Sequence, residues 1–85
     1  MKQIKWNKKA MKQLLKLQLK ARRNIISAVE ELPTPDGLRN VKQLTDHQYQ
    51  YRLKVGRYRV FFDLEKNEMR IYLIQEIKKR NERTY

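Results

Sequence analysis

The sequence has 85 residues, with 21 lysines and arginines against nine aspartates and glutamates, giving a formal net charge of +12. A chain this short supports one small core, so we predict a single domain over residues 1–85. The absence of cysteine excludes disulfides and thiolate metal sites. No apolar run is long enough for a signal peptide or a membrane span, which predicts a cytoplasmic protein. The excess positive charges repel one another in a compact state, so they indicate a polyanionic partner. Nucleic acid is the favoured partner, and an acidic protein partner is compatible with it.

The first half of the chain has the pattern of a short strand followed by helices. Residues 3–6 alternate polar and apolar side chains, and Asn7 is a typical helix N-cap. Two apolar stripes at helical spacing follow, and Pro33 ends the second. One continuous helix of about 25 residues also fits the spacing, but it would protrude from so small a domain. We therefore predict a helical hairpin, broken near Leu17–Lys20. The stripes comprise Met11, Leu14 and Leu15, and then Ile25, Ile26, Val29 and Leu32.

The second half predicts antiparallel strands, and a loop rich in turn-forming residues, 33–37, precedes it. Two alternating stretches, 49–55 and 58–64, flank Gly56-Arg57, a pair typical of a type II′ hairpin turn. The resulting register places apolar pairs on one face, which we predict to be the core face. These pairs are Val55 with Tyr58, Leu53 with Val60, and Tyr51 with Phe62.

A second two-residue turn at Lys66-Asn67 would add a third strand to this sheet. It would pair Leu64 with Met69, Phe62 with Ile71, and Val60 with Leu73, so the same face stays apolar across three strands. The predicted fold class is α+β, with a short N-terminal strand and a helical hairpin packed on a twisted antiparallel sheet.

The opposite face of the predicted sheet carries cations beside aromatic rings. Like charges directly opposite one another, such as Lys54 and Arg59, destabilise a sheet by about a few tenths of a kcal/mol. A solvated face whose cations splay apart is one interpretation. Cations beside aromatic rings are also how a surface binds a phosphate chain and stacks its bases, and we favour that interpretation. The other predicted pairs on this face are Arg52 with Phe61, Arg59 with Ile74, Phe61 with Tyr72, and Asp63 with Arg70.

The C-terminal segment is too polar to continue a core. An antiparallel last strand would return Lys78-Lys79-Arg80 to the Gly56-Arg57 end of the sheet, where Lys54 and Arg59 also lie. Tyr85 could stack on a base or cap the core.

Two stretches carry a resemblance to a known family. Residues 51–60, YRLKVGRYRV, are similar to the hairpin of the RelE branch of the RelE/ParE toxin superfamily, and residues 79–85, KRNERTY, are similar to its tail. The hairpin is shared by several branches, whereas hairpin and tail together indicate the RNA-cleaving one. The resemblance spans nearly the whole chain. It implies the toxin of a type II toxin–antitoxin system, a ribosome-dependent endoribonuclease that cuts mRNA in the A site beside 16S rRNA and inhibits translation. It also implies a cognate acidic antitoxin that wraps the basic surface.

The resemblance further implies chemistry without a metal or cofactor, in which the 2′-hydroxyl attacks the adjacent phosphate. Neighbouring positive charge disfavours the protonated form of Lys54, which would allow it to act as a base. Arg52 stands where lysine is usual in RelE itself, and Lys79 competes with Arg80 for the role near the leaving group. The catalytic residues carried over by position are Arg52, Lys54, Arg59 as the phosphate clamp, Arg80, and Tyr85 as the base-stacking tyrosine. The residues expected to bind RNA are Arg57, Phe61, Tyr72, Lys78, Lys79 and Arg83.

His47 and Ser27 are further residues whose chemistry suits a catalytic site. His47 is the only histidine and stands in a loop-like segment, so we interpret it as a solvated loop residue without the partners of an acid–base couple or a metal site. Ser27 has no histidine partner for a hydrolase triad. Two alternative functions stay open. One is a ParE-like, non-enzymatic poison of DNA gyrase, and the other is a basic nucleic-acid-binding module whose binding depends on salt.

Overall fold

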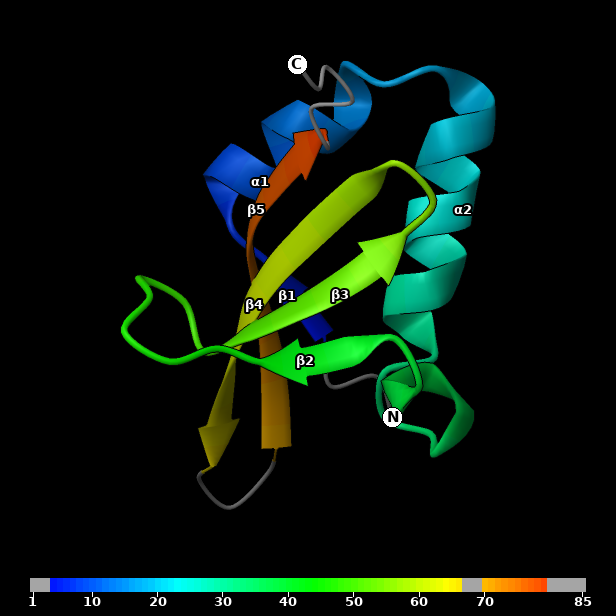
Figure 1. Cartoon of the computed structure of the whole chain (residues 1–85). Coiled ribbons are helices and arrows are strands. Elements are labelled where there is room, and N and C mark those ends of the chain that lie inside the picture. The colour runs from blue at the N-terminus through cyan, green and yellow to red at the C-terminus, as the bar shows by residue number, and fades with distance from the viewer. Residues whose placement is uncertain (1–3, 67–69, 80–85) are drawn as a thin grey trace, which may run out of the picture.

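The computed structural model describes residues 4–66 and 70–79 and has an α+β fold, as predicted (Figure 1). Its helices are α1 and α2, and a short 3₁₀ turn, η1, follows them. Five strands form one sheet in the order β1-β5-β4-β3-β2. In chain order the elements are β1 (Ile4–Trp6), α1 (Lys8–Leu15), α2 (Leu19–Glu30), η1 (Asp36–Leu38), β2 (Val41–Gln43), β3 (Tyr51–Val55), β4 (Tyr58–Lys66) and β5 (Arg70–Lys79).

The N-terminal strand and the helical break agree with the sequence prediction. The Asn7 side chain caps α1 by accepting a hydrogen bond from the Ala10 backbone N–H at 2.7 Å. The helices separate between Leu15 and Leu19, and the Arg22 guanidinium holds this connection by donating to the carbonyl oxygens of Leu15 and Leu17. These hydrogen bonds satisfy carbonyl groups that the end of α1 leaves without helical partners.

The sheet is mixed, because β1 pairs with β5 in parallel while every other neighbouring pair is antiparallel. The predicted hairpin register is confirmed, with Val55 opposite Tyr58 and Leu53 opposite Val60. Gly56 has a φ of 57°, the positive value that the first position of a type II′ turn requires. The edge strand β2, which the sequence pattern did not predict, pairs with β3.

The predicted register between β4 and β5 is wrong. Leu64 pairs with Tyr72 rather than with Met69, a displacement of three residues. An odd displacement moves the side chains of residues 71–74 to the other face of the sheet. Residues 69–74 have apolar side chains at odd-numbered and at even-numbered positions alike. The sequence pattern therefore could not choose between the two registers. With the same displacement, Phe62 lies opposite Ile74 and Asp63 opposite Leu73. Beyond an irregularity between Phe61 and Phe62 the displacement is four residues, and there Phe61 lies opposite Glu76, Val60 opposite Ile77, and Arg59 opposite Lys78.

A β-bulge lies within the pairing of β4 and β5. Phe62 pairs with Ile74 and its neighbour Phe61 pairs with Glu76, so Gln75 is the extra residue of β5. A bulge of this kind re-aims the side chains that follow it. Here it allows both Ile74 and Ile77 to enter the core.

The core lies between the two helices and one face of the sheet. Burying these apolar side chains supplies the main stabilisation, at about 25 cal/mol per Å² of apolar surface. No helix among the described residues is long and apolar enough to cross a membrane. The buried core residues are Ala10, Leu14, Ile25, Val29, Leu32, Leu53, Val60, Phe62, Tyr72, Ile74 and Ile77.

Candidate nucleic-acid interface

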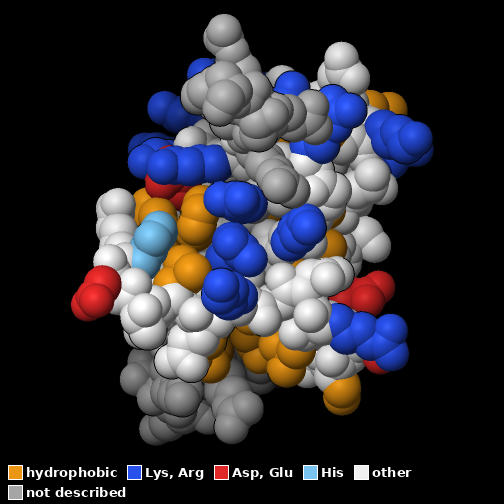
Figure 2. Space-filling view, viewed as in Figure 1, with side chains coloured by type: hydrophobic (Ala, Val, Ile, Leu, Met, Phe, Trp, Pro, Cys, Tyr) orange, Lys and Arg blue, Asp and Glu red, His pale blue; other side chains and the backbone are white. Residues whose placement is uncertain are grey.

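Three cations form a row across the sheet face that is turned away from the helices. Lys54 of β3 lies directly opposite Arg59 of β4, as predicted, and Arg59 lies directly opposite Lys78 of β5. We call Lys54, Arg59 and Lys78 the cation row. Lys54 and Lys78 are exposed, and Arg59 is half-buried. Lysine and arginine side chains gather over this face in the space-filling view (Figure 2).

Arg52 lies next to the cation row on the same face of the sheet, two residues before Lys54 on β3. With Lys54, Gly56, Tyr58 and Arg59 it lines a hollow of about 170 Å³ beside the hairpin turn. The Nε atom of Arg52 is buried and has no hydrogen-bond partner among the described residues. An unsatisfied buried donor costs about 1–3 kcal/mol unless a water or a ligand accepts a hydrogen bond from it. The hollow therefore presents arginine and lysine side chains to a group that would accept hydrogen bonds from them.

Lys42 adds a cation at the β2 edge that the sequence prediction missed. It is exposed and lies directly opposite Arg52. Finding it required β2, whose three residues are too few to show a clear alternation.

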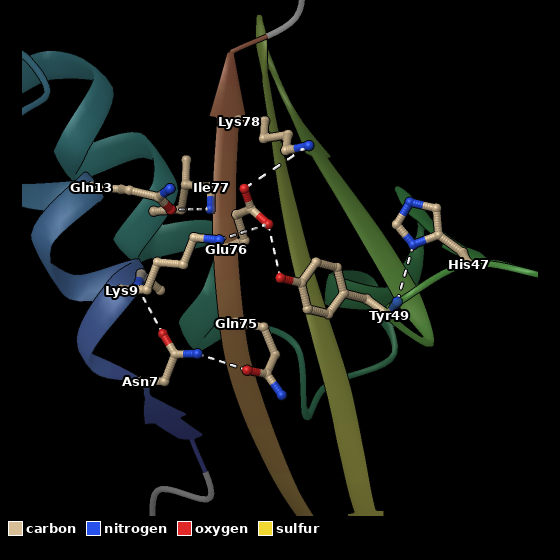
Figure 3. A network of polar contacts seen from close by, with 10 residues as sticks. Asn7, Lys9, Gln13, His47, Tyr49, Gln75, Glu76, Ile77 and Lys78 are labelled. Atoms are coloured by element: carbon tan, nitrogen blue, oxygen red, sulfur yellow. Dashed lines mark hydrogen bonds and ion pairs between the residues drawn. The ribbon is translucent and has the colours of Figure 1, made fainter.

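A buried carboxylate, Glu76, adjoins the cation row (Figure 3). It accepts a hydrogen bond from the Tyr49 hydroxyl at 2.8 Å, and it forms ion pairs with Lys9 at 3.5 Å and Lys78 at 3.9 Å. Burial alone would raise the pKa of Glu76, but the Tyr49 hydrogen bond and the charges of Lys78 and Lys9 outweigh it, so the pKa is lowered. Burial, together with Glu76, raises the pKa of Tyr49. Glu76 is thus a charged anchor beside the cations, which sequence reasoning did not identify.

The aromatic residues do not lie as predicted. Tyr72 is buried in the core and contacts Phe62, so the prediction that it lies on the cationic face with the RNA-binding residues is wrong, because the register shift turns it toward the helices. Phe61 does lie on the cationic face, but it is only 7% exposed. The His47 ring covers it in a stacked arrangement at 5.2 Å, and the Tyr49 ring packs beside it at 5.6 Å.

The remaining predicted residues divide between the two sides of the sheet. Arg57 is exposed in the hairpin turn. Lys79 pairs with Tyr58 and lines a hollow on the helix side with Gln13 and Leu17. The structure therefore brings Lys78, and not Lys79, together with Arg59. Arg80, Arg83 and Tyr85 lie outside the described residues.

The described residues contain no group of three or more histidine, cysteine, aspartate or glutamate side chains that could hold a metal ion. The helix-free face of the sheet carries positive charge around the hollow, next to the aromatic rings of His47, Tyr49 and Phe61. Such a surface can bind the phosphates of a nucleic acid and contact its bases.

Comparison with known proteins identifies the family. A family model described as "ParE toxin of type II toxin-antitoxin system, parDE" matches residues 4–84. The chain belongs to this family. It is therefore a type II toxin of the RelE/ParE superfamily, as the sequence resemblance implied, although the matching model carries the ParE name and not that of the RelE branch. No curated protein sequence gives a significant match.

Solved structures similar to this toxin come from toxin–antitoxin complexes. A chain of the RelBE2 complex from Mycobacterium tuberculosis has a TM-score of 0.75 at 17% identity, over 93% of this chain and 98% of that one. A chain of the RelE–RelB complex from Pyrococcus horikoshii has a TM-score of 0.72 at 23% identity, over 96% and 98%. A chain of the RelB–RelE complex from Methanococcus jannaschii has a TM-score of 0.66 at 18% identity, over 88% of both. The fold of this toxin is therefore RelE-like.

Proposed function

We propose that this toxin is a ribosome-dependent endoribonuclease that cuts mRNA in the A site. The observation that carries the proposal is the cation row, with Arg52 beside it, around a hollow on the helix-free face of the sheet. The proposed chemistry is attack of the 2′-hydroxyl on the adjacent phosphate, without a metal cofactor.

The cations suit the charge that develops in this reaction. Attack of the 2′-hydroxyl builds negative charge on the phosphate oxygens, and preorganised positive groups stabilise a transition state of this kind. The planar fork of Arg59 fits a phosphate with two hydrogen bonds, and it lies between the other two cations of the row. Among the described residues Arg59 has no carboxylate partner, so its charge is available to a ligand.

Lys54 is the proposed base. It lines the hollow together with Arg59 and Arg52, so a phosphate bound there would have the lysine amine next to it. A neutral lysine amine at this place can accept the proton of the attacking 2′-hydroxyl. Arg80 and Tyr85 keep the leaving-group and base-stacking roles that the family resemblance implies.

An acidic antitoxin is the proposed protein partner. The net charge of +12 leaves a self-repelling surface, and an acidic chain would neutralise it. The similar solved chains come from complexes of toxins with antitoxins, which supports such a partner.

A gyrase poison is the second candidate function, and the ParE description of the matching family favours it. This alternative predicts DNA damage rather than cut mRNA. A non-enzymatic gyrase poison would not need the hollow lined by Arg52, Lys54 and Arg59 for catalysis.

The proposal is tested with a defined mRNA on programmed ribosomes, where cleavage is read by primer extension for wild-type protein and Arg59→Ala. We expect cuts within the A-site codon that require ribosomes and disappear in the folded variant. A parallel supercoiling assay with purified gyrase examines the second candidate. Gyrase inhibition without mRNA cuts would replace the endonuclease proposal.

A further inference from the structure

The His47 ring is held in one place although it lies in an exposed loop. It stacks on Phe61 with the ring planes only 14° apart, and one face of Phe61 is thereby covered. Phe61, the residue expected to stack on RNA bases, is therefore buried, and the exposed ring over it belongs to His47.

Two hydrogen bonds and a backbone turn fix this ring. The Tyr49 backbone N–H donates to His47 Nδ1 at 3.0 Å, so the neutral ring carries its proton on Nε2. The Tyr49 hydroxyl in turn donates to the buried Glu76, which ties the loop to β5 (Figure 3). Asp46, just before the histidine, has a positive φ of 52°, a strained value for a residue with a side chain. The loop thus contains one strained residue, and its two hydrogen bonds hold the His47 ring over Phe61.

The supported ring lies next to the proposed phosphate site. Phe61 is two residues from Arg59 on the same face of β4, a separation of about 7 Å along the strand. Phe61 also lies directly opposite Arg52. Figure 2 shows the histidine beside hydrophobic side chains, with lysine and arginine side chains gathered next to them.

We propose that His47 is a stacking platform for a nucleobase of the RNA whose phosphate the cation row binds. This inference rests on the proposed function and adds a base contact to it. A flat ring that packs on Phe61 and is exposed in its loop offers a surface on which bases stack, and the contacts that hold it reduce the entropy lost on binding. His47 is an exposed loop residue, as the sequence predicted, and the proposal adds a role to it.

The platform is tested by binding to a short single-stranded RNA in which 2-aminopurine replaces one adenine. Ribosomes are left out, so no cleavage is required. Stacking quenches the fluorescence of 2-aminopurine. We expect quenching with wild-type toxin, and a dissociation constant at least about fivefold higher for His47→Ala. His47→Phe, which keeps a flat ring, should restore both, and Gln48→Ala in the same exposed loop should behave as the wild type.

A matched RNA with an abasic site, at the position that 2-aminopurine occupies in the first RNA, separates stacking from charge. Binding to this RNA is followed by the change in anisotropy of a dye at its 5′ end. If the ring acts by stacking, wild-type toxin and His47→Ala should bind the abasic RNA equally well. An equal loss on both RNAs, or a His47→Phe variant as weak as His47→Ala, would overturn the platform. Base-dependent binding by a wild-type protein that cuts no mRNA on ribosomes would overturn the nuclease proposal and leave the platform standing.

Discussion

Replacing Arg59 by glutamine is expected to stabilise the fold while it removes RNA cleavage. Arg59 lies directly opposite two cations, Lys54 and Lys78. Like charges opposite one another in a sheet destabilise it by about 0.2–1 kcal/mol for each pair, and exposed lysines fall at the low end because water screens them. Removing both repulsions should therefore add about 0.5 kcal/mol to the free energy of unfolding. For a domain of this size, that corresponds to a Tm higher by about 2–4 °C.

The assay is thermal unfolding by circular dichroism at low and at high salt, combined with cleavage on programmed ribosomes. The gain in Tm should fade near 1 M salt, where the Debye length falls to about 3 Å. Arg23→Gln is the matched control, because Arg23 is an exposed arginine on α2, away from the sheet. It makes the same change in charge, and we expect little effect on Tm and none on cleavage. A loss of about 1 kcal/mol or more in Arg59→Gln would refute the argument, since it would mean that Arg59 supports the fold.

Three further predictions concern the base, the buried carboxylate and the helix cap. Lys54→Arg keeps the charge but provides no usable base, so we expect it to bind RNA and not cleave it on ribosomes; wild-type cleavage by this variant would remove Lys54 as the base. The Glu76 pKa is lowered in the folded protein, so its carboxylate stabilises the fold above the ordinary glutamate pKa and this contribution is lost as the pH falls through the lowered value. Urea unfolding between about pH 6 and pH 3 should thus show a steeper loss for wild type than for Glu76→Gln, and identical slopes would count against the charged anchor. Asn7→Ala removes the cap of α1 and should lower the free energy of unfolding by about 1 kcal/mol in urea titrations; no change would show that the capping bond contributes nothing.

The sequence pattern predicted the elements whose local signals were strong. Gly56-Arg57 favours a two-residue type II′ turn, and that turn determined the hairpin register and the pairing of Lys54 with Arg59. Asn7 and the change in apolar stripe gave the start of α1 and the break between the helices. In each case a few neighbouring residues carry the necessary information.

The parts that failed depend on contacts distant in the sequence. The register of β5 depends on packing in the core and on the pairing of β5 with β1. Neither leaves a local signal in the sequence. That register, together with the bulge, decides whether Tyr72 or Glu76 lies opposite Phe61 on the cationic face. The position of His47 depends on Phe61 and on the hydrogen bond from Tyr49 to Glu76, and residues 47 and 76 are far apart in the chain. A lone histidine in a polar loop gives no sign of such support.

The most direct test of the central claim uses an mRNA with a single 2′-deoxy nucleotide at the cleaved position of the A-site codon on programmed ribosomes. The account predicts that wild-type toxin cuts the all-ribose mRNA there and leaves the 2′-deoxy mRNA intact, because the attacking hydroxyl is missing. Cleavage of the 2′-deoxy mRNA at the same position, or no cleavage of either mRNA, would contradict it.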